Sequence, residues 1–93
     1  MTATPTASDL LRQDTTLRDA LSEALGIERE RVASFNNDSG LFGALPEFDS
    51  MAVATLLTLI EEKFDTIIED DDVEAEDFIT YGSLLAFIRR KLG

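Results

Sequence analysis

The strongest structural signal in the chain is the repeat of apolar residues between Ser50 and Phe64. They recur every three or four residues, which places them on one face of a helix: Val53, Leu56, Leu57, Ile60 and Phe64. Asp49 and Ser50 precede the repeat, and both residue types commonly cap helix N-termini. An amphipathic helix of this kind has to bury its apolar face against other elements, so the chain needs partner helices or a sheet.

A second helix is predicted upstream. Its apolar residues also share one face: Leu10, Leu11, Leu17, Leu21, Ala24 and Leu25. The helix starts either near Ser8 or at Thr16, whose spacing to Asp19 fits a capping box. Gly26 follows the last apolar residue and is expected to end the helix as a C-cap.

Two more helices are predicted downstream. A short one is expected around Val73 to Phe78, with both of these side chains facing inward. Thr80 is expected to cap a last helix over residues 81–91. Its inward-facing residues are Leu84, Leu85, Ile88 and Leu92.

The segment 26–48 is predicted to be a long loop whose apolar side chains hold it to the core. The predicted fold is therefore an irregular all-α four-helix bundle: three longer helices, one short helix, and a long loop between the first two. Ninety-three residues suit a single domain, which we expect over residues 9–93. Residues 1–8 are small, polar and interrupted by Pro5, and we expect them to be a disordered lead.

The charge excludes several kinds of partner. Nineteen acids against eight bases give a net charge of −11, and the one basic run, Arg89 to Lys91, lies at the chain end. Nucleic acids and anionic membrane surfaces need clustered bases, so we expect a basic protein surface as partner.

The longest uncharged stretches have 11 residues, too few for membrane insertion. No secretory signal is visible, which favours a cytoplasmic location.

The residue types also argue against catalysis. Without Cys or His, the chain lacks thiol nucleophiles, thiolate metal ligands and the commonest general base. No P-loop, dinucleotide fingerprint or G-x-S-x-G motif occurs. Asp70, Asp72 and Glu74 match the first EF-hand ligands in spacing, but Ala75 and Tyr81 stand where Gly and Glu are required. We expect neither an enzyme nor a metal site.

Taken alone, Ser50 is an ordinary residue at a helix start. From about residue 16 to residue 91, however, the sequence resembles the acyl carrier and peptidyl carrier protein family. Four segments in order carry the resemblance: Leu25-Gly26-Ile27 with Val32, Phe48-Asp49-Ser50-Met51, Leu59-Ile60-Glu61-Glu62-Lys63-Phe64, and Phe78-Ile79-Thr80 before an apolar helix.

The resemblance implies an acyl-carrier-like bundle with 4′-phosphopantetheine attached to Ser50, beside Asp49. A phosphopantetheinyl transferase would transfer the group from coenzyme A. Acyl or aminoacyl cargo would travel as a thioester from a loading ligase to acyltransferases or synthases with basic docking patches. The implied partner face on the second long helix comprises Met51, Ala54, Thr55, Thr58, Glu61 and Glu62.

Two departures from the family pattern indicate a specialised carrier rather than fatty-acid synthase service. Ala52 and Thr55 stand where family members often have acids, and the loop containing residues 41–46 is longer. A dedicated ligase, or a secondary-metabolite or surface-polysaccharide pathway, suits such a carrier. The alternative from another class is an acidic helical interaction module that uses the same face without a prosthetic group. In either case we expect a monomer.

Overall fold

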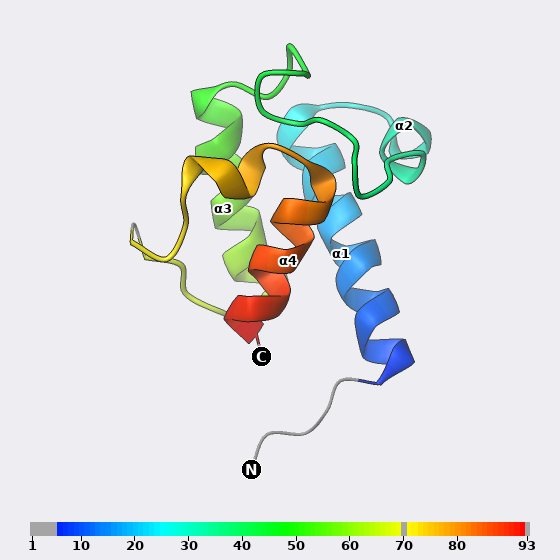
Figure 1. Cartoon of the computed structure of the whole chain (residues 1–93), viewed down its shortest axis with the longest axis vertical. Helices are drawn as coiled ribbons and strands as arrows, with labels where there is room; N and C mark the ends of the chain where they lie inside the picture. Colours follow the sequence, from blue (N-terminus) through cyan, green and yellow to red (C-terminus); the bar gives the residue numbers. More distant parts are fainter. Residues whose placement is uncertain (1–5, 70, 93) are drawn as a thin grey trace.

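A computed structural model describes residues 6–69 and 71–92, and within them every regular element is helical (Figure 1). The elements are α1 (Ala7–Leu25), α2 (Arg29–Ala33), α3 (Ser50–Phe64), the 3-10 helix η1 (Ala75–Phe78) and α4 (Tyr81–Leu92). The predicted all-α bundle of three longer helices and one short helix is confirmed. The loop between the first two long helices contains the short helix α2, which the sequence analysis did not predict.

The first helix, α1, begins well before the possible capping box at Thr16 and Asp19. Thr6 is the N-cap, and its side chain and that of Asp9 form a reciprocal capping box. Thr16 therefore lies inside the helix, and the alternative start near Ser8 is the better prediction. Ala7 and Ser8 of the predicted lead are helical, while residues 1–5 of that lead lie outside the described residues. Gly26 ends α1 in the left-handed conformation, as predicted.

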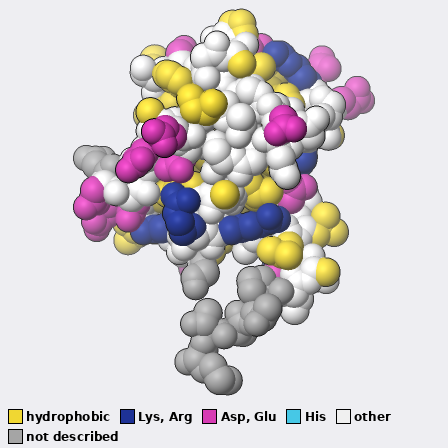
Figure 2. All heavy atoms as spheres, in the orientation of Figure 1, with side chains coloured by type: hydrophobic (Ala, Val, Ile, Leu, Met, Phe, Trp, Pro, Cys, Tyr) yellow, Lys and Arg dark blue, Asp and Glu magenta, His cyan; other side chains and the backbone are white. Residues whose placement is uncertain are grey.

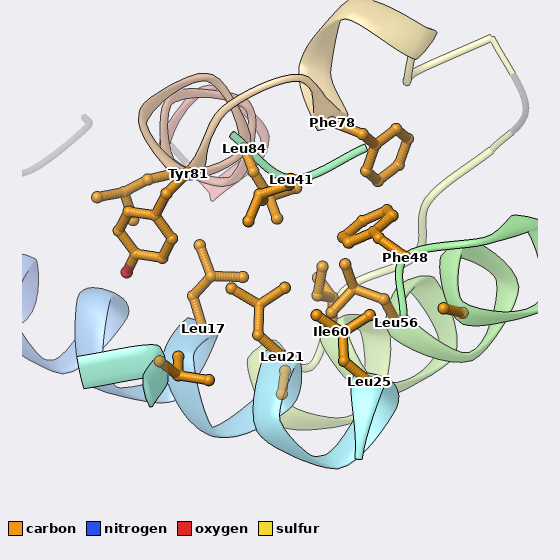
Figure 3. Close-up of a cluster of buried hydrophobic side chains, with 14 of the residues drawn as sticks. Leu17, Leu21, Leu25, Leu41, Phe48, Leu56, Ile60, Phe78, Tyr81 and Leu84 are labelled. Atoms are coloured by element: carbon orange, nitrogen blue, oxygen red, sulfur yellow. The ribbon is translucent and has the colours of Figure 1, made fainter. Parts of the chain in front are cut away.

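One core joins all the long elements (Figure 3). Side chains from α1, the loop, α3, η1 and α4 meet there: Leu17, Leu21, Leu25, Leu41, Phe48, Leu56, Ile60, Phe78, Tyr81 and Leu84. The predicted inward positions of Leu10, Leu11 and Leu92 are wrong, because these side chains are exposed. The first turns of α1 extend past the ends of the other described helices (Figure 1), and the Leu11 side chain there is 67% exposed.

The long loop is fastened to the junction of η1 and α4. Four backbone hydrogen bonds join the two segments: Leu41 N–H to Ile79 O (2.8 Å), Phe42 N–H to Phe78 O (2.9 Å), Tyr81 N–H to Ser39 O (2.9 Å) and Gly82 N–H to Asn37 O (3.0 Å). Gly82 is required for this approach, since a Cβ there would lie 2.7 Å from the Asn37 carbonyl oxygen. The loop is therefore held against the rest of the fold, as its apolar residues predicted.

Arg18 of α1 holds the other end of the loop. Its guanidinium donates hydrogen bonds to the carbonyls of Val32 (2.6 Å) and Phe35 (2.9 Å) and lies 4.4 Å from the ring centroid of Tyr81. The Tyr81 hydroxyl donates to the Asp14 carboxylate. Partial burial favours a raised pKa for Asp14, but the hydrogen bonds from Tyr81 and Arg18 outweigh it and lower the pKa.

Candidate functional site

The first turn of α3 is shaped by its cap. Asp49 is the N-cap, and its carboxylate accepts a hydrogen bond from the Ala52 N–H at 2.8 Å. Ser50 is the first helical residue and its side chain is exposed. The N–H groups of Ser50 and Met51 have no acceptor within the helix, because the first helical donors lack a preceding turn. A hydroxyl therefore stands in solvent at the positive end of a 15-residue helix.

The chain before Ser50 is anchored from both sides. Phe48 is buried, and its N–H donates to the Leu45 carbonyl at 3.0 Å. Glu47 pairs with Arg31 of α2 at 2.7 Å, and the hydrogen bond from Arg31 lowers the pKa of Glu47. These contacts fix the residues that lead into α3, so the position of the Ser50 hydroxyl is set by the core and by α2.

A pocket of about 240 Å³ opens beside this hydroxyl. Its lining comes from the loop, α3 and η1: Phe42, Ser50, Val53, Ala75 and Phe78. Ser50 supplies the one polar side chain of this lining, and the others are apolar. The sequence pattern predicts an inward-facing Phe78 and packs the apolar residues of segment 26–48, Phe42 among them, against the core, but it does not connect these residues or Ala75 with Ser50. Ala75 and Phe78 lie 25 or more residues after Ser50, and Phe42 lies in the loop before it. Only the folded structure therefore shows that these three residues meet beside Ser50.

The predicted partner face is mostly exposed. Met51 is 80% exposed, and Ala54, Thr55, Thr58 and Glu62 are exposed as well. Glu61 differs from the rest, because it is half-buried and its carboxylate accepts the Ile68 N–H at 2.9 Å. That bond holds the segment after α3 against the helix. Glu61 therefore stabilises the fold in addition to lying near the predicted partner face.

Acidic residues are most frequent in the segment that follows α3. Figure 2 shows acidic side chains over the segment that follows α3, next to the basic side chains at the end of α4. Lys91 pairs with Asp72 at 2.7 Å and Arg90 with Asp77 at 3.4 Å. Within residues 6–69 and 71–92, no group of three or more acids is arranged to hold a metal ion. The same residues include no helix with the length and apolar character needed to cross a bilayer.

The donor set at Ser50 fits a phosphodiester-linked group. The exposed hydroxyl can form the ester bond, and free helix N–H groups favour the negative phosphate. The carboxylate of Asp49 accepts the Ala52 N–H, which holds this carboxylate at the cap position beside Ser50. The apolar pocket offers a surface for whatever an attached arm carries.

Comparison with known proteins agrees with this chemistry. The family model described as "Phosphopantetheine attachment site" matches residues 15–89. An acyl carrier protein from Exiguobacterium sp. strain AT1b is 34% identical over 79 residues, covering 82% of this chain and 89% of that protein. One from Exiguobacterium sibiricum is 32% identical with the same coverage.

A solved structure agrees as well. The solution NMR structure of a holo acyl carrier protein from Nitrosomonas europaea superimposes with a TM-score of 0.77 at 38% identity. The match covers 87% of this chain and 96% of the other. An acyl carrier function and a covalently bound 4′-phosphopantetheine follow from the sequence and structural matches together. The chain belongs to the acyl carrier protein family.

Proposed function

We propose that Ser50 is the residue to which 4′-phosphopantetheine is attached. The observation that carries the proposal is an exposed serine hydroxyl at the first position of α3, within Phe48-Asp49-Ser50-Met51. When bound, the group supplies a terminal thiol that holds acyl cargo, a chemistry that the Cys-free chain lacks. The chain's own contribution is to present and steer the group, and we propose no catalytic residue in it.

The attachment step balances without a base in this chain. The Ser50 Oγ forms a bond to the phosphorus of the phosphopantetheine half of coenzyme A, and the P–O bond to the adenosine bisphosphate breaks. The Ser50 proton passes to a base on the phosphopantetheinyl transferase. Asp49 supports this step by capping α3, which holds Ser50 at the start of the helix.

Partner enzymes approach along α3 from Ser50. Met51, Ala54, Thr55, Thr58 and Glu62 form the face that we assign to them, with Glu61 at its edge. Loading ligases, and acyltransferases or synthases with basic docking patches, are the proposed partners after priming. The net charge of −11 supports steering toward such patches. We place the carrier in the cytoplasm as a monomer.

The surface next to Ser50 supports service in a specialised pathway. Ala52 is buried and Thr55 is exposed but neutral, so the first two turns of α3 present no acid. Met51 is the most prominent apolar side chain there. A partner that binds this end of α3 needs an apolar contact surface. Basic groups on the partner can pair with acids only farther along, at Glu62 and the acidic residues that follow α3.

Intact-protein mass spectrometry tests the attachment site. The chain is incubated with coenzyme A and a broad-specificity phosphopantetheinyl transferase, alongside Ser50→Ala and the control Ser8→Ala, which alters an exposed serine of α1. We expect the wild-type chain and Ser8→Ala to gain one phosphopantetheine and Ser50→Ala to gain none. A gain in Ser50→Ala, or none in the folded wild type, would contradict the assignment.

A further inference from the structure

We propose that the ion pair between Arg31 and Glu47 positions Ser50 for the phosphopantetheinyl transferase. Both are positioning residues, because they act through the backbone that leads into α3. The inference rests on the proposed attachment at Ser50. It adds a role in the priming reaction for α2, the short helix that the sequence pattern did not predict.

The helix α2 is fixed to α1 at both of its ends. Before its start, the Ser22 hydroxyl of α1 donates to the Ile27 carbonyl at 2.7 Å. At its end, Arg18 donates to the Val32 and Phe35 carbonyls at 2.6 Å and 2.9 Å. The Val32 side chain is buried in the core. A side chain that reaches out from α2 therefore has a rigid support.

Arg31 is the side chain that connects α2 to the loop before α3. Its guanidinium lies 2.7 Å from Glu47 Oε2. The other carboxylate oxygen, Glu47 Oε1, is shielded from solvent and makes no hydrogen bond within the described residues. Without Arg31, this partly buried charge would have no partner, which is unfavourable. We therefore expect Glu47 to turn into solvent when Arg31 is removed.

Glu47 lies in the turn that leads to Ser50. Only Phe48 and Asp49 separate it from Ser50. The Phe48 N–H donates to the Leu45 carbonyl at 3.0 Å, so this hydrogen bond closes a turn that contains Glu47. A displaced Glu47 would strain this turn and loosen the backbone on which the cap of α3 is built.

The expected effect is on recognition of the carrier. A transferase has to hold the Ser50 hydroxyl in line with the phosphorus of coenzyme A, which requires a defined entry into α3. If only a fraction of the chains has that arrangement, the apparent affinity falls by the same fraction. The KM for the carrier should then rise, while kcat changes little because bound chains share one arrangement.

Initial rates of priming test the proposal. Intact-protein mass spectrometry follows the mass gain at saturating coenzyme A and a series of carrier concentrations. We expect Arg31→Ala and Glu47→Ala each to raise KM by roughly two- to fivefold. The double variant should be no worse than either single variant, since the two residues act as one pair.

A matched control comes from the same helix. Arg29 pairs with Asp19 of α1 at 2.6 Å, and this pair lies on the α1 side and not on the loop. Arg29→Ala removes the same charge and an ion pair of similar length, and it should leave KM unchanged. Arg31→Lys keeps a cation near Glu47 and should lose less than Arg31→Ala.

The two alanine variants also separate positioning from electrostatic steering. Arg31→Ala makes the chain more negative and Glu47→Ala makes it less negative, so steering would change KM in opposite directions. Melting curves establish that each variant is folded at the assay temperature. As a second measurement, the backbone amide shifts of Ser50 and Met51 should change in both variants and stay in place in Arg29→Ala.

The outcomes distinguish this inference from the attachment itself. No mass gain in the wild type would contradict the attachment. With the wild type primed, four results would overturn the positioning role: a KM that Arg31→Ala or Glu47→Ala leaves unchanged, opposite changes in these two variants, additive losses in the double variant, or an equal rise in Arg29→Ala.

Discussion

The carboxylate of Asp49 accepts the backbone N–H of Ala52 at 2.8 Å, and Ser50 lies between these two residues in the first turn of α3. This bond closes the turn that carries the proposed attachment hydroxyl. Because the cap satisfies one donor of the helix N-terminus and leaves others free, it combines helix stability with a site for an anionic group.

Removing the cap should loosen that turn. Asp49→Ala loses the acceptor for the Ala52 N–H and is expected to lower the free energy of unfolding by about 1 kcal/mol. Urea unfolding measures the change. Asp49→Asn is the matched control, since Asn caps as well as Asp, and it should retain most of the stability. Equal losses in the two variants would show that the charge matters and the cap does not.

The core contribution of α3 depends on Leu56, which is fully buried. Leu56→Ala is expected to cost about 2–5 kcal/mol, because it removes buried methyl groups and leaves a cavity. Leu11→Ala makes the same chemical change at a side chain that is 67% exposed and should stay within about 0.5 kcal/mol of wild type. Similar losses at the two positions, measured by urea unfolding, would contradict the described packing.

The bond between Tyr81 and Asp14 should make stability depend on pH. Tyr81→Phe removes a hydrogen bond to a carboxylate and is expected to cost about 1–2 kcal/mol at pH 7. The pKa of Asp14 is lower in the folded chain than in the unfolded one, so its contribution is present above roughly pH 4. The contribution disappears as the pH falls through the folded pKa.

The difference in stability between wild type and Tyr81→Phe should therefore shrink as the pH falls from 5 to about 2.5. Unfolding by urea across this range measures it. A difference that stays constant across the series would mean that the ionised Asp14 carboxylate does not accept this bond.

Salt should stabilise the acidic half of the molecule. Ten acids lie between Glu61 and Asp77 against the single base Lys63, and pairs such as Lys91 with Asp72 neutralise them only in part. Screening of this repulsion should raise the melting temperature as sodium chloride increases from 10 to about 500 mM. A melting temperature that falls would instead show that the pairs made by Arg90 and Lys91 dominate.

The sequence predicted the long helices because their apolar periods and caps are local. The cap at Asp49, the C-cap at Gly26 and the buried positions of Leu56 and Ile60 all follow from short-range patterns. The period alone could not show that the first turns of α1 extend past the bundle, so Leu11 was placed in the core. Whether a side chain is buried depends on which other segments pack against it in the fold. That packing is set by the whole chain and not by the local sequence.

The candidate site also has a part that the local sequence predicts and a part that it does not. Ser50 and the exposed residues of α3 were found from a contiguous motif and its helix. The pocket was not found, because Phe42, Ala75 and Phe78 meet through the backbone pairing of two segments that are distant in the sequence. The bond from the Ile68 N–H to the Glu61 carboxylate was not predicted either, because a helical pattern does not show contacts with the chain that follows the helix.

We propose that the acyl carrier function depends on the hydroxyl of Ser50. Tandem mass spectrometry of the primed wild-type chain tests it most directly, because fragment masses assign the added group to one residue. We expect a single phosphopantetheine on Ser50, with every other serine, including Ser34 and Ser83, unmodified. A phosphopantetheine on any other residue would contradict it.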